Sequence, residues 1–194
     1  MLDLLITSIL KLVNTPLSAV TVIEVLVLLY LFMFPAKETE FVWNNFCARG
    51  LYLQIDGFRV LYAGIAAFMW MMTTIFSREY FAHYRNRNRY YLFTLVTLGA
   101  TVGVFLSADL ITTFIFFEIM SLASYVWVVH EQDKDAMSAG KTYLTIAVLG
   151  GMVLLMGLFL LYSITGTLVI SELYDAVIKA GSSTKLYAAV FCML

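Results

Sequence analysis

Long runs of apolar residues separated by short polar breaks dominate the hydropathy pattern of this chain. A membrane-spanning helix needs about 20 mainly apolar residues to cross a hydrocarbon core about 30 Å thick. Five runs meet that need: Pro16–Pro35, Phe58–Phe76, Tyr90–Leu106, Leu110–Val129 and Thr142–Ile164. A sixth begins near Leu186. The pattern therefore predicts an all-α, polytopic membrane helix bundle with about five full transmembrane spans plus the start of a sixth.

The two ends of the chain depart from this pattern. The first residues, MLDLLITSILKLV, are too short to cross a membrane and predict an interfacial amphipathic helix or an extension of the first span. No basic region precedes this apolar run, which argues against a cleaved signal peptide. Residues 186–194 supply only about 14 Å of helix. Because unpaired carbonyls at a helix end are unfavourable in lipid, we expect a partner chain to cover this end.

The polar breaks predict the orientation in the membrane. Arg78, Arg85, Arg87 and Arg89 fall in the loop 77–89, SREYFAHYRNRNR, which the positive-inside rule places in the cytoplasm. The alternative interpretation of this loop is a contact with anionic lipid. Counting spans from there places the mixed-charge loop 130–141 inside as well.

By the same count, residues 36–57 and 107–109 lie outside. Within the first of these segments, GLYLQIDG alternates apolar and polar residues and turns at Asp56-Gly57. This alternation predicts a short strand or hairpin on the membrane surface before the second span.

Composition supports a membrane protein. Hydrophobic residues make up 62% of the 194 residues and charged residues 13%, whereas soluble domains have about 45–50% apolar and about 25% charged residues. A monomeric soluble enzyme is therefore nearly excluded, and the net charge of −1 argues against nucleic acid as a partner. Cys47 and Cys192 are far apart and predict neither a disulfide framework nor a metal site. No cofactor-binding motif is present.

Two glutamates fall inside predicted spans, where an ionisable residue is a functional hypothesis by default because it is costly in lipid. Glu118 lies about midway through its span, and hydroxyl-bearing residues share its helical face: Thr112, Thr113, Ser121, Ser124 and Tyr125. This polar stripe favours a proton- or ion-relay carboxylate over an acid buried for packing. Glu24 has no such stripe, so we expect it to be an interfacial anchor or to form an intramembrane pair with another subunit.

Other charges stand near the ends of the spans. Asp109 opens the fourth span, where the helix dipole favours an acid; a role in ion uptake is the alternative. Lys141 opens the fifth span and has two interpretations, snorkelling to the interface or pairing with an intramembrane acid. His83 and His130 lie in or beside loops, so we expect both to be surface histidines.

Residues 51–173 resemble a known family. The stretch ADLITTFIFFEIMSLASYVWVV, followed by AGKTYLTIAVLGG and an ending in LLYSITGTL, resembles the antiporter-like membrane subunits of respiratory complex I, of Mrp-type cation/proton antiporters and of energy-converting hydrogenases. The upstream LQIDGF-R is similar to the family's segment before that core. The resemblance implies that Glu118 belongs to an ion-translocating machinery, that Lys141 stands at a family lysine position, and that Asp109 stands at a polar one.

The chain also departs from the family pattern. The resemblance implies a lysine partner on the following helix, but the sequence stops at KLYAAVFCML as that helix begins. Lys185 lies at the membrane edge and is not assigned that role. The family's second half, an inverted repeat, is absent, and the N-terminal region is one span short. These departures favour a split subunit whose missing helices come from a second chain; a truncated or decayed gene is the alternative.

Together these patterns predict two regions: residues 1–57, with the N-terminal helix, first span and outer loop, and residues 58–194, the N-terminal part of an antiporter-like core. We expect a non-redox membrane subunit, without cofactor or metal, that contributes to proton or sodium translocation in a larger complex. The expected location is a prokaryotic cytoplasmic membrane. The alternative is a structural scaffold subunit without its own ion path; a free-standing small channel is a third hypothesis.

Overall fold

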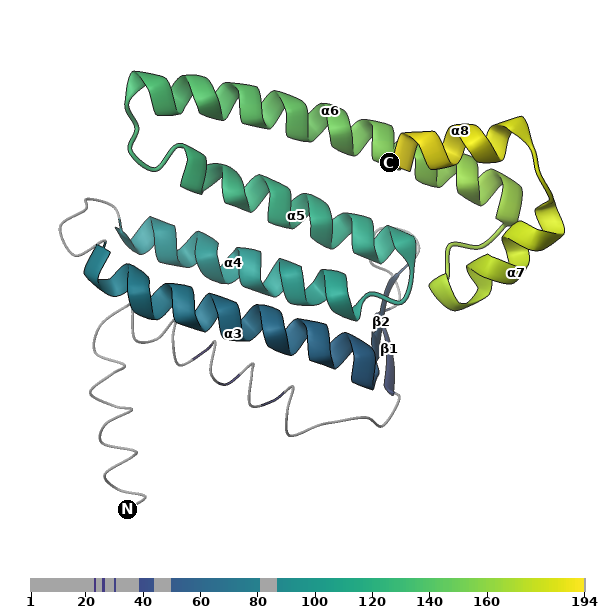
Figure 1. Cartoon of the computed structure of the whole chain (residues 1–194), viewed down its shortest axis with the longest axis horizontal. Helices are drawn as coiled ribbons and strands as arrows, with labels where there is room; N and C mark the ends of the chain where they lie inside the picture. Colours follow the sequence, from purple (N-terminus) through teal and green to yellow (C-terminus); the bar gives the residue numbers. More distant parts are fainter. Residues whose placement is uncertain are drawn as a thin grey trace, which may run out of the picture.

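The structure, a computed structural model, describes residues 39–43, 50–80 and 87–193, together with the single positions Ile23, Leu26 and Tyr30. In this part of the chain, a hairpin of two strands precedes a series of helices (Figure 1). The elements are β1 (Thr39–Trp43), β2 (Leu51–Ile55), α3 (Gly57–Tyr80), α4 (Arg87–Leu106), α5 (Leu110–Val128), α6 (Lys134–Thr165), α7 (Ile170–Ala180) and α8 (Thr184–Met193).

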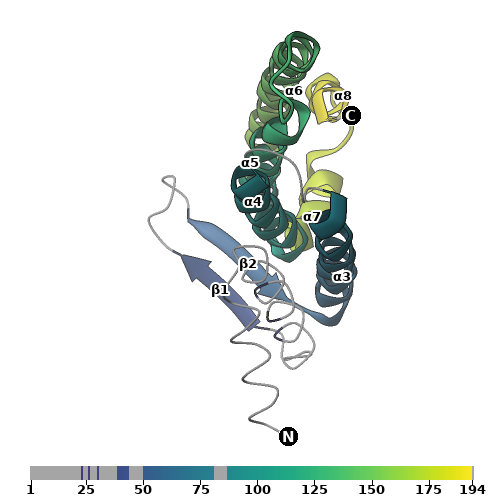
Figure 2. The same cartoon turned by 90° about the vertical axis from the view of Figure 1, so that its left-hand side faces the viewer.

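The four longest helices, α3 to α6, are each long and apolar enough to cross a membrane. They run side by side (Figure 1), and an end-on view shows a curved row from α3 to α6 with α7 and α8 on one side (Figure 2). Large apolar side chains point outward along this row, including Phe76 at 73% exposure and Ile146 at 66%. Such surfaces are unfavourable in water and suit contact with lipid or with other membrane helices.

These helices confirm the second to fifth predicted spans, but not the predicted count of five plus a sixth. The first predicted span, 16–35, lies outside the described residues apart from Ile23, Leu26 and Tyr30, which have helical backbone. The helix α6 begins at Lys134, eight residues before the predicted start at Thr142, because Asp133 caps it by accepting a hydrogen bond from the Ala136 amide. At 10 residues, α8 is shorter than a span.

Small and hydroxyl-bearing residues line the contacts between neighbouring helices, as is typical of membrane proteins. Examples that are almost completely buried are Ala63, Ala67, Thr97, Ala100 and Thr112. Thr97 and Thr101 satisfy their hydroxyl groups within α4 by donating to carbonyls one turn earlier, at 2.7 and 2.8 Å. Polar side chains can therefore be buried between these helices without an unpaired donor.

The hairpin confirms the strand predicted from the alternation at residues 51–55. β1 and β2 pair antiparallel, with Thr39 opposite Ile55 and Trp43 opposite Leu51. The backbone of Tyr52 joins the hairpin to the turn between α4 and α5: its carbonyl accepts from the Ala108 amide at 2.9 Å, and its amide donates to Thr112 Oγ1 at 3.1 Å. The hairpin is thus fixed to the end of the row where α5 begins.

Two short helices follow α6. Gly166 ends α6 with φ of +72°, a left-handed conformation that glycine adopts without strain. The next residues form an antiparallel bridge between Val169 and Asp109, and α7 starts directly after it. α8 then runs back along the C-terminal part of α6 (Figure 1), where Leu161, Leu168 and Ala189 form a buried apolar cluster. The predicted sixth segment therefore corresponds to α8, which begins at Thr184.

Candidate functional site

Glu118 lies near the middle of α5, about 12 Å along the helix axis from Leu110. Its carboxyl group packs against Gly151 on α6: a Cβ atom built at Gly151 would lie 2.8 Å from Glu118 Cδ and 2.9 Å from Oε2. Within the described part of the chain, the buried Oε1 atom has no hydrogen-bond partner. An acid without a hydrogen-bond donor inside a membrane helix is unusual, since buried polar atoms are normally paired.

A cluster of hydroxyl groups lies on the same side of α5, toward its C-terminal end. Ser124 Oγ on α5 and the Tyr143 hydroxyl on α6 are 2.6 Å apart. Both also lie near the Ser121 carbonyl oxygen, at 2.8 Å from Ser124 Oγ and 3.0 Å from the Tyr143 hydroxyl. Six residues of helix, or about 9 Å, separate this cluster from Glu118 along α5. Within the predicted polar stripe, the Ser124 side chain therefore faces α6.

The other members of the predicted stripe have local structural partners. Thr112 is fully buried and receives the hydrogen bond from the hairpin. Thr113 donates to the Asp109 carbonyl at 2.9 Å. Tyr125 lies beside Gly140, where a Cβ atom would come 3.1 Å from its ring. The residues of the stripe therefore make separate contacts with the hairpin, with the backbone of α5 and with α6. Among the described residues they do not form one continuous polar path.

Asp109 is the N-cap of α5: its Oδ1 atom accepts from the Thr112 amide at 3.2 Å, and its side chain is almost fully buried. This is the arrangement that the helix-dipole interpretation predicts. Asp109 also lines a cavity of about 220 Å³, together with Tyr52, Tyr162 and residues 166–169. A role in ion uptake stays a prediction.

The structure does not bring Lys141 and Glu118 together. Gly140 packs against Val129 and Tyr125 at the C-terminal end of α5, so the adjacent Lys141 lies about 15 Å from the level of Glu118 along the helix axis. The Lys141 side chain is exposed, and no ion pair joins it to an acid in the described ranges. Two other candidate residues, Glu24 in the N-terminal part and His83 in the basic loop, lie outside the described residues.

His130 follows α5 in the turn to α6. Its ring lies 5.6 Å from the Tyr90 ring, centroid to centroid, and its carbonyl accepts from Arg89 at 3.5 Å. Partial burial lowers the pKa of His130 below its usual value; the neighbouring Arg89 lowers this pKa further, and Glu131 raises it. His130 is therefore half-buried against α4, and the prediction of a surface histidine was only partly right.

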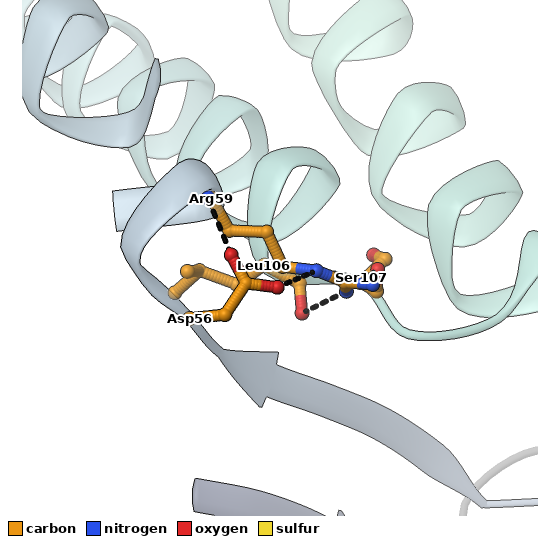
Figure 3. A network of polar contacts seen from close by, with 4 residues as sticks. All are labelled: Asp56, Arg59, Leu106 and Ser107. Carbon is orange, nitrogen blue, oxygen red and sulfur yellow. Dashed lines mark hydrogen bonds and ion pairs between the residues drawn. The ribbon is translucent and has the colours of Figure 1, made fainter. Parts of the chain in front are cut away.

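Arg59 was not singled out from the sequence. Its Nε atom lies 2.9 Å from Asp56 Oδ2, and its Nη1 atom donates to the carbonyl oxygens of Leu106 and Ser107 (Figure 3). The Asp56 side chain also caps α3 through the Arg59 amide at 2.8 Å. A cation at these carbonyls is favourable because they form the negative end of the α4 dipole. The signal in the sequence was an acid and a base three residues apart across a predicted turn.

These residues do not form a metal centre. Within the described part of the chain, no three His, Cys, Asp or Glu side chains gather closely enough to hold a metal ion. The arrangement instead offers one intramembrane carboxyl group and a nearby pair of hydroxyls, which are groups that accept and donate protons.

The sequence is similar to those of known membrane antiporter proteins. Residues 107–194 match the family model described as "NADH:quinone oxidoreductase/Mrp antiporter, TM". A Na⁺/H⁺ antiporter subunit of Alkalihalophilus pseudofirmus is 30% identical over 132 residues, which are 68% of this chain and 26% of that protein. The chain therefore spans about a quarter of the length of this curated relative.

Solved structures share the fold. A chain of the Mrp complex from Dietzia sp. superposes with a TM-score of 0.75 at 20% identity, covering 91% of this chain and 20% of that chain. A chain of respiratory complex I from Thermus thermophilus gives 0.73 at 16% identity, covering 92% of this chain and 38% of that chain. The present chain is a multi-pass integral membrane protein, and it belongs to the antiporter-like subunit family of Mrp antiporters and NADH:quinone oxidoreductases.

Proposed function

We propose that this chain is part of the proton- or sodium-translocating membrane domain of a multi-subunit complex of the Mrp or complex I type, and that Glu118 is its relay carboxylate. The observation that carries the proposal is the buried Glu118 Oε1 atom, which has no hydrogen-bond partner among the described residues. A glutamate held only for packing gains nothing from an unpaired oxygen, whereas a relay group has to exchange partners.

The hydroxyl cluster of Ser124 and Tyr143 supports a path toward one side of the membrane. It lies between Glu118 and the turn at residues 129–133, on the α5–α6 contact. With about 9 Å between the cluster and the carboxyl group, water has to bridge the gap. The positive-inside prediction for the basic loop assigns this side to the cytoplasm.

The cation that balances Glu118 is proposed to come from beyond the described residues. Gly157 on α6 packs against Ala189 and Met193 of α8, and α8 runs toward the level of Gly151. A segment continuing in this direction comes level with Glu118 about 9 Å further on. It can belong to the same polypeptide or to another membrane subunit, and Lys141 is placed too far away for this role.

Replacing Glu118 by glutamine tests the proposal, because the amide keeps the shape and removes the exchangeable charge. In vesicles containing the assembled complex, we expect Glu118→Gln to lower ion flux at least tenfold while assembly is retained. Glu172→Gln, at an exposed acid on α7, is the matched control and keeps full flux. Unchanged flux in Glu118→Gln would contradict the relay and support the scaffold alternative.

A further inference from the structure

Gly150 and Gly151 are adjacent glycines in the middle of α6 with opposite surroundings. A Cβ atom built at Gly150 meets no atom within 4 Å. The same atom at Gly151 lies 2.8 Å from Glu118 Cδ and contacts both carboxyl oxygens. Both residues have the same helix propensity. They differ in burial, since Gly151 is buried and Gly150 is exposed, and in the contact with Glu118.

The closest contact at Gly151 is made by the carboxyl group of Glu118. The three atoms nearest to the built Cβ are Cδ, Oε1 and Oε2 of Glu118, so the carboxyl group lies directly over Gly151. Amides in the middle of α6 donate within their own helix and cannot serve the acid. The position is therefore a pocket for a carboxyl group, created by one missing side chain.

We propose that Gly151 is a positioning residue for Glu118: its missing side chain forms the seat on α6 that holds the carboxyl group at mid-span. The inference rests on the function proposed above. A charged carboxylate without a donor is costly there, so the seat accepts the protonated acid and the ionised form leaves it.

In the described part of the chain, no other charge faces this seat from the elements packed on α5. The charged residues on α4 and α6, which are Arg87, Arg89, Lys134, Asp135 and Lys141, all belong to the end of the helix row where α5 finishes. The strand β2, which also contacts α5, carries no charged residue, and its Tyr52 amide donates to Thr112 Oγ1. Among the described residues, occupancy of the seat therefore depends on the shape of α6 and the protonation of Glu118.

The test compares Gly151→Ala with the matched control Gly150→Ala in the assembled complex. The first readout is ion flux in vesicles, and the second is the labelling rate of Glu118 by dicyclohexylcarbodiimide, which reacts with protonated acids in apolar surroundings. We expect Gly151→Ala to lower flux at least fivefold and labelling several-fold, because the carboxyl group is expelled toward water. Gly150→Ala stays within twofold of the parent in both.

A double variant separates seating from general damage. Glu118→Asp withdraws the carboxyl group by one methylene, so Glu118→Asp combined with Gly151→Ala should retain more flux than the product of the two single effects predicts. If Gly151→Ala fails to assemble, recovery of assembly in the double variant supports the seat. Equal behaviour of the two alanine variants, or a double variant without recovery, overturns it. Loss of flux in Glu118→Gln alongside either of those results leaves the relay intact and rejects only the role of Gly151.

Discussion

The hydroxyl groups of Ser124 on α5 and Tyr143 on α6 lie 2.6 Å apart, across the same helix contact that holds Glu118 against Gly151. This pair is a side-chain hydrogen bond between α5 and α6. It lies about 9 Å along the helix axis from Glu118, in the direction of the turn between α5 and α6. If Glu118 is the relay carboxylate that we propose, this pair is the next group along the path of its proton.

Removing the Tyr143 hydroxyl tests this step. Tyr143→Phe keeps the ring that packs between the helices and removes the hydrogen bond between Ser124 and Tyr143. The expected cost is about 1 kcal/mol in stability. We expect ion flux to fall several-fold in vesicles while the assembled complex is recovered at normal yield. Thr145→Val is the matched control, because among the described residues the Thr145 hydroxyl bonds within its own helix, at 2.9 Å from the Lys141 carbonyl. Normal flux in Tyr143→Phe shows that the cluster is structural.

Arg59 provides a prediction about stability. Its side chain is 16% exposed and contacts Asp56 and the last carbonyls of α4. Arg59→Met leaves these partners without a cation, so we expect a loss of about 1.5–3 kcal/mol, the range for hydrogen bonds to charged groups. Arg59→Lys should recover only part of the lost stability, since an ammonium group lacks the forked geometry of the guanidinium group. Thermal unfolding of the detergent-solubilised protein measures both, with Lys179→Met on exposed α7 as the control; equal melting of all three contradicts the prediction.

Substitutions at Asp109 distinguish a helix-capping role from a role in ion uptake. Asparagine caps a helix as well as aspartate does, whereas alanine loses about 1 kcal/mol. We therefore expect Asp109→Asn to keep the melting temperature and at least half of the flux, and Asp109→Ala to lower the melting temperature. A large loss of flux in Asp109→Asn at unchanged stability contradicts this expectation and favours the ion-uptake hypothesis for the adjacent cavity.

Hydropathy predicted the long helices well because an apolar run of sufficient length has few other stable arrangements. It placed the start of α6 wrongly because Asp133, a capping residue, decides where that helix begins, and the first turns are polar. It missed α7 for a related reason. That helix is short and amphipathic, with Glu172 and Lys179 among apolar residues, so no continuous apolar run marks it.

The candidate site was predictable in part. The polar stripe predicted that hydroxyl-bearing residues share the helical face of Glu118, and both Glu118 and Ser124 contact α6. The contact with Gly151 was not predictable, because the register between two apolar helices depends on three-dimensional packing. The same register places Lys141 level with the end of α5, whereas its position at the start of an apolar run left open both snorkelling to the interface and pairing with an intramembrane acid.

His130 leads to a prediction about pH. Burial and the neighbouring Arg89 lower the pKa of this histidine, so the folded protein binds its proton less readily than the unfolded chain, whose histidine has a pKa of about 6.5. Stability is therefore fully present above about pH 6.5 and falls as the pH drops from there to the lowered folded pKa. Below that value no further loss from His130 is expected.

Substituting His130 and Glu131 in turn tests both the size and the sign of this effect. His130→Gln cannot titrate, so its melting temperature in detergent should change less between about pH 7.5 and about pH 5 than that of the parent protein. Glu131 raises the pKa of His130, so Glu131→Gln lowers it further and should widen the pH range over which stability is lost. A parent and a His130→Gln variant that lose stability in parallel would assign the acid sensitivity to other groups.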